Sequence, residues 1–158
     1  MRFVLALVVA IGLSSPAAAG DVAKADGFEV LSSTKGYAAL LADLKAAVKD
    51  NKMGLVTEAG PTEVAAKRGE TIPGNRVVGV FRNDFAVTII RAAPEAMIEA
   101  PIRIMVHENA DGTAMLAYKR PSHVFAPYTG GDGGAVVAEA ANTLDGLFAT
   151  IAAAAVAD

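Results

Sequence analysis

The segment from Asn75 to Pro121 constrains the fold most, because it carries the strand patterns against which the rest of the chain can pack. Between residues 102 and 107, apolar side chains alternate with polar or flexible ones, a period of two that is typical of a strand with one face on a core. Asp111-Gly112 is typical of a hairpin turn, because glycine adopts the positive φ that such turns use. Residues 113–119 are therefore predicted to return beside the first strand, and residues 77–81 predict a third, buried strand.

Helices and further strands are predicted on both sides of this segment. The clearest helix covers residues 37–48, where apolar side chains recur at helical spacing. In residues 85–92 two signals compete: Asp84 can cap a helix, but Val87 to Ile90 have strand-like propensity, and we predict a helix. The other predicted elements are strands at 28–32 and 55–58 and helices at 61–68 and 137–151. Together they predict an α+β fold.

One domain is predicted for residues 20–158, because the chain has 158 residues, enough for one proper core and too few for two. Within it, Gly130 to Gly134 form a predicted hinge, so residues 130–158 comprise this hinge and the C-terminal helix. The alanine-rich end, Ala152 to Ala157, is expected to fray. His123 follows Pro121 on a predicted loop and is expected to be a surface residue.

The N-terminus has the three parts of a secretory signal peptide, predicted to cover residues 1–19. Arg2 supplies a positive charge, Phe3 to Leu13 form an apolar run, and Ala17-Ala18-Ala19 precede Gly20 as a cleavage site. The alternative is a membrane anchor, but the run is shorter than the roughly 20 residues needed to span a bilayer. We therefore expect a periplasmic or secreted protein with no stable membrane insertion after cleavage.

The composition excludes several classes of site. The chain has no cysteine, which rules out disulfides, thiolate nucleophiles, cysteine metal ligands and covalent c-type haem attachment. The formal net charge is −3, and the basic pairs Lys67-Arg68 and Lys119-Arg120 are isolated. Because nucleic-acid binding depends on a basic patch, we expect no nucleic-acid partner.

The usual catalytic motifs are absent from the sequence as well. His107 and His123 are the two histidines, and no Gly-x-Ser-x-Gly elbow or phosphate-binding Gly-x-x-x-x-Gly-Lys loop accompanies them. A small hydrolase or isomerase could still use two carboxylates, but no spacing singles out a pair. The candidates are Glu58, Glu63, Asp84, Glu95, Glu99 and Glu108.

One constellation favours a metal. Met105 and His107 share the outward face of their strand, and if His107 pairs near Thr113, Met115 falls opposite Met105 on that face. Thioether and imidazole ligands suit copper(I), so these three residues are the predicted metal site, for copper or for haem. The alternative is that the methionines fill an apolar contact or dimer surface and the histidine lies at the sheet edge.

Several short motifs, in their order along the chain, resemble one family. They are Gly27-Phe28, the Ala39 to Leu44 helix segment, Gly54-Leu55-Val56, Phe81-Arg82-Asn83, Ala93-Pro94-Glu95-Ala96, Ala100-Pro101-Ile102, and Asp111-Gly112 with Tyr118 and Pro121. From about Gly27 to Pro121, the chain resembles the domain-of-unknown-function 302 family (DUF302). The resemblance implies a TATA-binding-protein-like α+β domain in which helices pack on one face of a curved antiparallel sheet. It also implies homodimers, and no established reaction.

The chain departs from the family pattern at two places. Family members often carry a histidine after the Gly-Leu-Val step, and residues 59–63 contain none; Phe-Gly-Asn-Pro is replaced by residues 81–84, Phe-Arg-Asn-Asp. No ligand or metal role at those positions is carried over. The sequence therefore predicts an exported, non-catalytic domain that binds a ligand or partner. The alternatives are a copper- or haem-binding accessory protein and a small hydrolase or isomerase.

Overall fold

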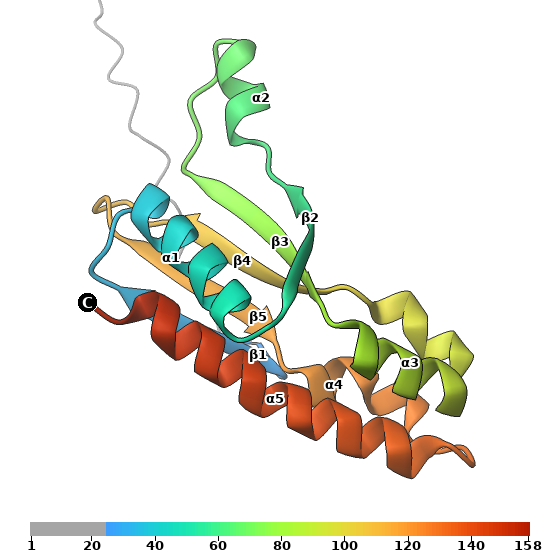
Figure 1. The fold of residues 1–158 in the computed structure, drawn as a ribbon. Helices are drawn as coiled ribbons and strands as arrows, with labels where there is room; N and C mark the ends of the chain where they lie inside the picture. The colour runs from blue at the N-terminus through green and yellow to red at the C-terminus, as the bar shows by residue number, and fades with distance from the viewer. Residues whose placement is uncertain (1–24) are drawn as a thin grey trace, which may run out of the picture.

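The structure is a computed structural model that describes residues 25–158, so the predicted signal peptide lies outside the described residues. Its elements are β1 (Phe28–Ser33), α1 (Tyr37–Asp50), β2 (Gly54–Ala59), α2 (Thr62–Lys67), β3 (Asn75–Phe81), α3 (Asn83–Ala92), η1 (Pro94–Glu99), β4 (Ile102–Glu108), β5 (Ala114–Lys119), α4 (Pro121–Phe125), η2 (Ala126–Tyr128) and α5 (Gly134–Val156). Figure 1 shows their arrangement.

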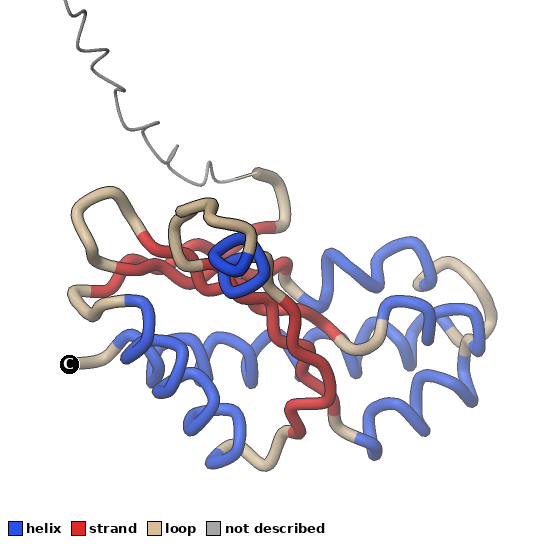
Figure 2. The backbone as a smooth tube through the Cα atoms, turned by 90° about the horizontal axis from the view of Figure 1, so that it is seen from above, coloured by secondary structure: helices blue, strands red, loops and turns tan. Residues whose placement is uncertain are grey.

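The strands form one five-stranded sheet in the order β1-β5-β4-β3-β2, and every neighbouring pair is antiparallel. The long helices α1 and α5 lie on the same side of the strands, and α3, η1 and α4 gather at one end (Figures 1 and 2). The sheet twists toward β2 and β3 (Figure 2), as β-strands of L-residues do. The predicted α+β fold, with helices against one face of an antiparallel sheet, is confirmed.

The core lies between the sheet and these two helices. On β4, Ile102, Ile104 and Val106 are buried, as the alternating pattern predicted. They face the apolar stripes of α1 and α5, whose fully or almost fully buried side chains are Leu40, Leu44, Val48, Val137, Leu144, Phe148 and Ile151. Burial of this apolar surface is the main favourable contribution to folding.

The predicted fraying of the C-terminus is wrong. Helix α5 continues to Val156, and Ala152 and Ala155 are fully buried, because α1 packs against this end of α5. The ammonium group of Lys35 also donates a hydrogen bond of 3.1 Å to the carbonyl oxygen of Ala155. Among the described residues, α5 alone has the length and apolar composition of a membrane span, and its place in the core accounts for that composition.

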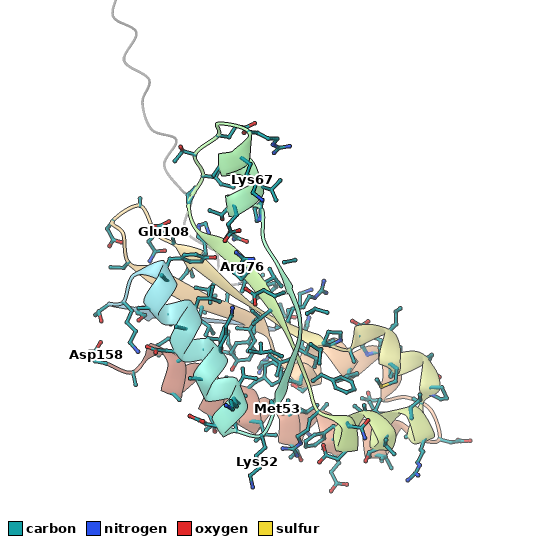
Figure 3. All side chains as sticks on the ribbon, turned by 45° about the horizontal axis from the view of Figure 1, so that its top comes forward. Lys52, Met53, Lys67, Arg76, Glu108 and Asp158 are labelled. Carbon is teal, nitrogen blue, oxygen red and sulfur yellow. The ribbon has the colours of Figure 1, made fainter. Side chains whose placement is uncertain are left out.

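Helix α2 and its flanking loops, residues 60–74, project as an arm from the end of the β2–β3 pair (Figure 1). All six residues of β2 are exposed. Arg76 lies at the base of the arm (Figure 3) and forms ion pairs with Glu58 of β2, at 3.6 Å, and with Glu63 of α2. The nearby hydroxyl of Tyr37 is the largest cause of the raised pKa of Arg76, so this cluster connects the arm to α1.

Candidate functional site

The side of the sheet away from α1 and α5 is only partly covered by the described residues, and we call it the open face. Strands expose alternate residues to it, because successive side chains point to opposite sides of a sheet. The registers place these residues on the open face: Phe28, Val30 and Ser32; Met115, Ala117 and Lys119; Arg103, Met105 and His107; Asn75, Val77 and Gly79. Many of them are apolar, whereas a solvated sheet face is usually polar.

A hollow of about 440 Å³ lies on the open face, toward the end of the sheet where β1 and β4 begin and β5 ends. Its volume falls toward the lower end of the range of about 300–1,000 Å³ that is typical of small-molecule pockets. Strands β1, β3, β4 and β5 and helix α4 line it, with Phe28, Val77, Arg103, Met105, Ala117, Lys119, His123 and Val124, together with Glu99, Ile102 and Tyr118. The hollow therefore combines an apolar floor with charged groups.

Two of those charged groups are cations on neighbouring strands. Ile104 of β4 is paired with Tyr118 of β5, so the same register, continued by one residue, places Arg103 opposite Lys119. The Lys119 ammonium lies 5.4 Å from the ring centroid of Phe28, within cation–π range. Among residues 25–158, neither cation forms an ion pair with a carboxylate.

Glu99 is the carboxylate in the lining of the hollow. Its Oε1 accepts a hydrogen bond of 3.0 Å from the hydroxyl of Tyr128. This hydrogen bond is the largest cause of the raised pKa of Tyr128, since it holds the phenol proton against a negative charge. Tyr128 of η2 therefore orients the Glu99 carboxylate through this hydrogen bond.

His123 corrects the sequence prediction. It lies on α4, which begins at Pro121, and its ring is half-buried against Gly27. Proline is well tolerated in the first turn of a helix, so Pro121 starts a helix where we expected a surface loop. A Cβ atom on Gly27, whose φ is +75°, would lie only 2.2 Å from the imidazole carbon Cγ. Glycine at this position allows the imidazole to lie at the edge of the hollow.

The three predicted metal ligands share the open face, as expected, but not in the expected register. Met115 is opposite His107, and Met105 is opposite Ala117. The turn explains the shift: Thr113 stays in the loop, where its backbone N–H and hydroxyl both donate to Asp111, and the first pair is Glu108 with Ala114. The shift is two residues, so every side chain keeps its face.

The surroundings of the three residues differ. Met105 is half-buried and lines the hollow, whereas Met115 is 6% exposed beside it. The Nδ1 atom of His107 lies 3.3 Å from the amide nitrogen of Asn75, the residue opposite it on β3. Met105, His107 and Met115 are therefore neighbours on the open face.

The six candidate carboxylates do not converge on one site. Glu58 and Glu63 are paired with Arg76, and Asp84 with Arg82 at 2.8 Å, which lowers the pKa of Asp84. Glu108 accepts a hydrogen bond of 2.7 Å from the backbone N–H of Gly74, at the opposite end of β4 from the hollow. Within residues 25–158, no group of three or more His, Asp or Glu side chains is placed to hold a metal ion.

Most of the hollow was not predicted from the sequence. The alternating pattern placed Arg103 on the outward face of its strand. Phe28, Val77 and Ala117 come from other strands, and the sequence did not predict the order of those strands in the sheet. The available signal was the pair of apolar residues at alternate positions of β1, Phe28 and Val30, on the face opposite to Leu31.

A family model for DUF302, described as a domain of unknown function, matches residues 28–151. A solved structure described as the crystal structure of the uncharacterized conserved protein DUF302 from Bacillus stearothermophilus is similar, with a TM-score of 0.72 and 14% sequence identity. The similarity covers 83% of this chain and 99% of that one. At this identity the likeness shows the fold alone. No curated protein matches the chain significantly.

Proposed function

The chain belongs to the DUF302 family, and we propose that it is an exported binding domain that holds a small molecule with an apolar body in the hollow on the open face. One observation carries this proposal: the hollow has an apolar floor, formed by Val77, Met105 and Ala117, on a sheet face that no long helix of the described chain covers. Apolar surface that stays in water is unfavourable, at about 25 cal/mol per Å². A bound apolar group would remove it from water.

Binding is favoured over catalysis by the character of the charged groups. General acid–base catalysis needs a base within hydrogen-bond reach of the substrate, usually with a second titratable group nearby. Glu99 is the one carboxylate among the described lining residues, and it already accepts a hydrogen bond from Tyr128. A hydrolase or isomerase that uses two acids stays an alternative prediction.

The binding test uses a neutral apolar dye and two variants that each introduce one tryptophan, the largest side chain, into a chain that has none. N-phenyl-1-naphthylamine, excited directly, gains fluorescence when it enters an apolar site. We expect saturable 1:1 binding to the wild type and loss of most of it in Met105→Trp, which fills the hollow. Val136→Trp, at a 44% exposed position on α5, is the matched control and should bind like the wild type. Dye binding that is equal in all three proteins would refute the proposed site.

Export is part of the same proposal and rests on the signal-peptide pattern of residues 1–19. Cell fractionation followed by mass spectrometry of the purified chain checks it. The expected product lies in the periplasm or medium and begins at Gly20. A protein that stays in the cytoplasm and keeps residues 1–19 would contradict this part of the proposal.

Copper(I) binding is a second candidate, favoured by the register that places Met105, His107 and Met115 on one face. Two thioethers and an imidazole are ligands that copper(I) accepts, and haem would use the same residues as axial ligands. Competition with a chelator under reducing conditions checks it, in Met105→Leu, His107→Ala and Met115→Leu. We expect each variant to weaken binding, and Met97→Leu, on η1, to leave it unchanged. If the wild type binds no copper(I) or haem in competition, this candidate is wrong.

The homodimer implied by the family resemblance is also a proposal. The exposed edge strand β2, with Leu55 and Val56 at 38% and 52% exposure, offers unpaired backbone groups to a second copy. Sedimentation velocity over a range of protein concentrations measures the mass. Val56→Lys is expected to shift the equilibrium toward monomers, and an unchanged mass would exclude β2 from the interface.

A further inference from the structure

We infer that the ligand of the hollow is an organic anion, a carboxylate on an apolar body, whose head group lies between Arg103 and Lys119. The inference rests on the proposed binding function and adds the class of ligand to it. It comes from the charges of the described lining residues rather than from the shape of the hollow alone.

Arg103 and Lys119 form a like-charge pair beside the hollow. Arg103 and Lys119 occupy opposite positions on adjacent strands of the open face, by extension of the register that pairs Ile104 with Tyr118. Like charges directly opposite each other in a sheet are destabilising. Among residues 25–158, no carboxylate forms an ion pair with either cation. An anion between them would replace this repulsion by two attractions.

Arg103 and Lys119 differ from the other unpaired basic residues in lying together beside one hollow. Lys35, Lys45, Arg76, Arg82 and Arg120 each form an ion pair with a carboxylate of the described chain. The remaining basic residues of the described chain form none and lie outside the lining of the hollow: Lys49, Lys52, Lys67, Arg68 and Arg91. The protein is acidic, with a formal net charge of −3, so carboxylates are in excess. That two cations stay unpaired beside the same hollow is therefore not explained by a shortage of acids.

Apolar groups surround the two cations. Arg103 is two residues before Met105 on the same face of β4, and Lys119 lies over the Phe28 ring. A guanidinium matches a carboxylate with two parallel hydrogen bonds, which fixes the head group in orientation. The remainder of the ligand then extends over Met105, Val77 and Ala117, where it gains from apolar contact. A purely inorganic anion would leave this floor uncovered.

The experiment compares three ligands with one tail and different heads: octanoate, 1-octanol and octylammonium, each displacing N-phenyl-1-naphthylamine from the purified protein at neutral pH. We expect octanoate to bind about three- to tenfold more tightly than octanol, as for a charge-assisted contact in a site open to solvent. Octylammonium should bind more weakly than octanol. Added salt should weaken octanoate alone, because screening acts on the charged pair.

Arg103→Gln and Arg91→Gln remove the same charge from two exposed positions, and only the first lies in the hollow. We expect the ratio of the affinities for octanoate and octanol to fall toward one in Arg103→Gln and to keep its wild-type value in Arg91→Gln. The unfolding midpoint of Arg103→Gln should not fall, because the substitution relieves repulsion; a structural role for Arg103 would lower it.

The possible outcomes distinguish a failure of the anion inference from a failure of the proposed binding site. Equal displacement by octanoate and octanol, or an octanoate preference that survives in Arg103→Gln, would overturn the anion inference and leave a site for neutral ligands. Dye binding that is insensitive to Met105→Trp would instead refute the binding site itself, and the inference with it. Octanoate preference that depends on Arg103 and on salt supports both.

Discussion

Strand β4 presents two different surfaces from six consecutive residues. Ile102, Ile104 and Val106 point to the covered face, under α1 and α5, and are at most 6% exposed. The residues between them, Arg103, Met105 and His107, point to the open face and keep partial or full exposure. The same backbone therefore supports a closed core on one side and, on the other, a surface where a flexible apolar side chain lies between two polar ones.

The two faces of the sheet differ in whether the protein itself supplies the partners of their side chains. The covered face is packed within the described chain along β3, β4 and β5, where helices supply the partners of the buried apolar residues. The open face lacks such partners, and its cations Arg103 and Lys119 lack counter-ions among residues 25–158. A surface with unsatisfied interactions in the free protein is a surface that can gain from a ligand.

The largest expected effect comes from adjacent residues of β4. Ile104→Ala removes a side chain that is 0% exposed and should destabilise the protein by about 2–5 kcal/mol, because it leaves a cavity in the core. Met105→Ala, one residue further and half-buried on the open face, should cost less than half as much. Urea unfolding followed by circular dichroism measures both. Equal losses would mean that the open face is packed as tightly as the core.

The second prediction concerns the part of the open face that is filled. A Cβ on Gly79 of β3 would lie 2.1 Å from the hydroxyl oxygen of Thr57 and 2.7 Å from the Cγ atom of Pro101. Gly79→Ala should therefore destabilise the protein by about 1–3 kcal/mol, and adding Thr57→Ala should recover part of that loss. Thermal unfolding gives the comparison.

Gly146→Ala is the control for this pair. Gly146 is an exposed residue inside α5 with no atom within 4 Å of an added Cβ, so alanine should stabilise the helix by about 0.5–1 kcal/mol. A neutral Gly79→Ala would show that Thr57 and Pro101 move aside easily and that this end of the open face is loosely packed.

The sequence sufficed where the local pattern and the final packing agree. The period of two in residues 102–107 and the Asp111-Gly112 turn predicted β4 and the hairpin, and Gly112 has the expected positive φ of +83°. Helix α3 formed despite the β-branched run Val87 to Ile90, because Ile89 is buried on the face that packs near α5. There the tertiary contact outweighs intrinsic propensity.

The sequence fell short where non-local contacts decide. Ala152 and Ala155 look like the fraying end of a helix until α1 is placed against them. The hairpin register needed the hydrogen bonds of Asp111 to Thr113, which the pattern does not reveal. The hollow needed the order of all the strands, because Phe28 and Val77 reach it from opposite sides of the β5–β4 pair.

The smallest expected effect uses tyrosine ionisation to compare the two environments. Burial on the covered face, where Tyr118 packs with its ring centroid 5.6 Å from that of Phe148, is the largest cause of its raised pKa, and the charges of Glu29 and Asp145 add to it. A phenol whose pKa is raised above the unfolded value of about 10 contributes stability that is present below that pH and is lost as pH rises through the folded pKa.

Unfolding free energies of the wild type and Tyr118→Phe, measured by urea denaturation from pH 8 to pH 11, should therefore run parallel below about pH 10. Above it, the wild type should lose stability relative to the variant, because only the wild type must keep this phenol protonated in a buried place. Tyr128→Phe is the matched comparison, since the pKa of Tyr128 is raised chiefly by its hydrogen bond to Glu99 rather than by burial. If the Tyr118→Phe curve stays parallel to the wild type through pH 11, the covered face admits more water around Tyr118 than its burial implies.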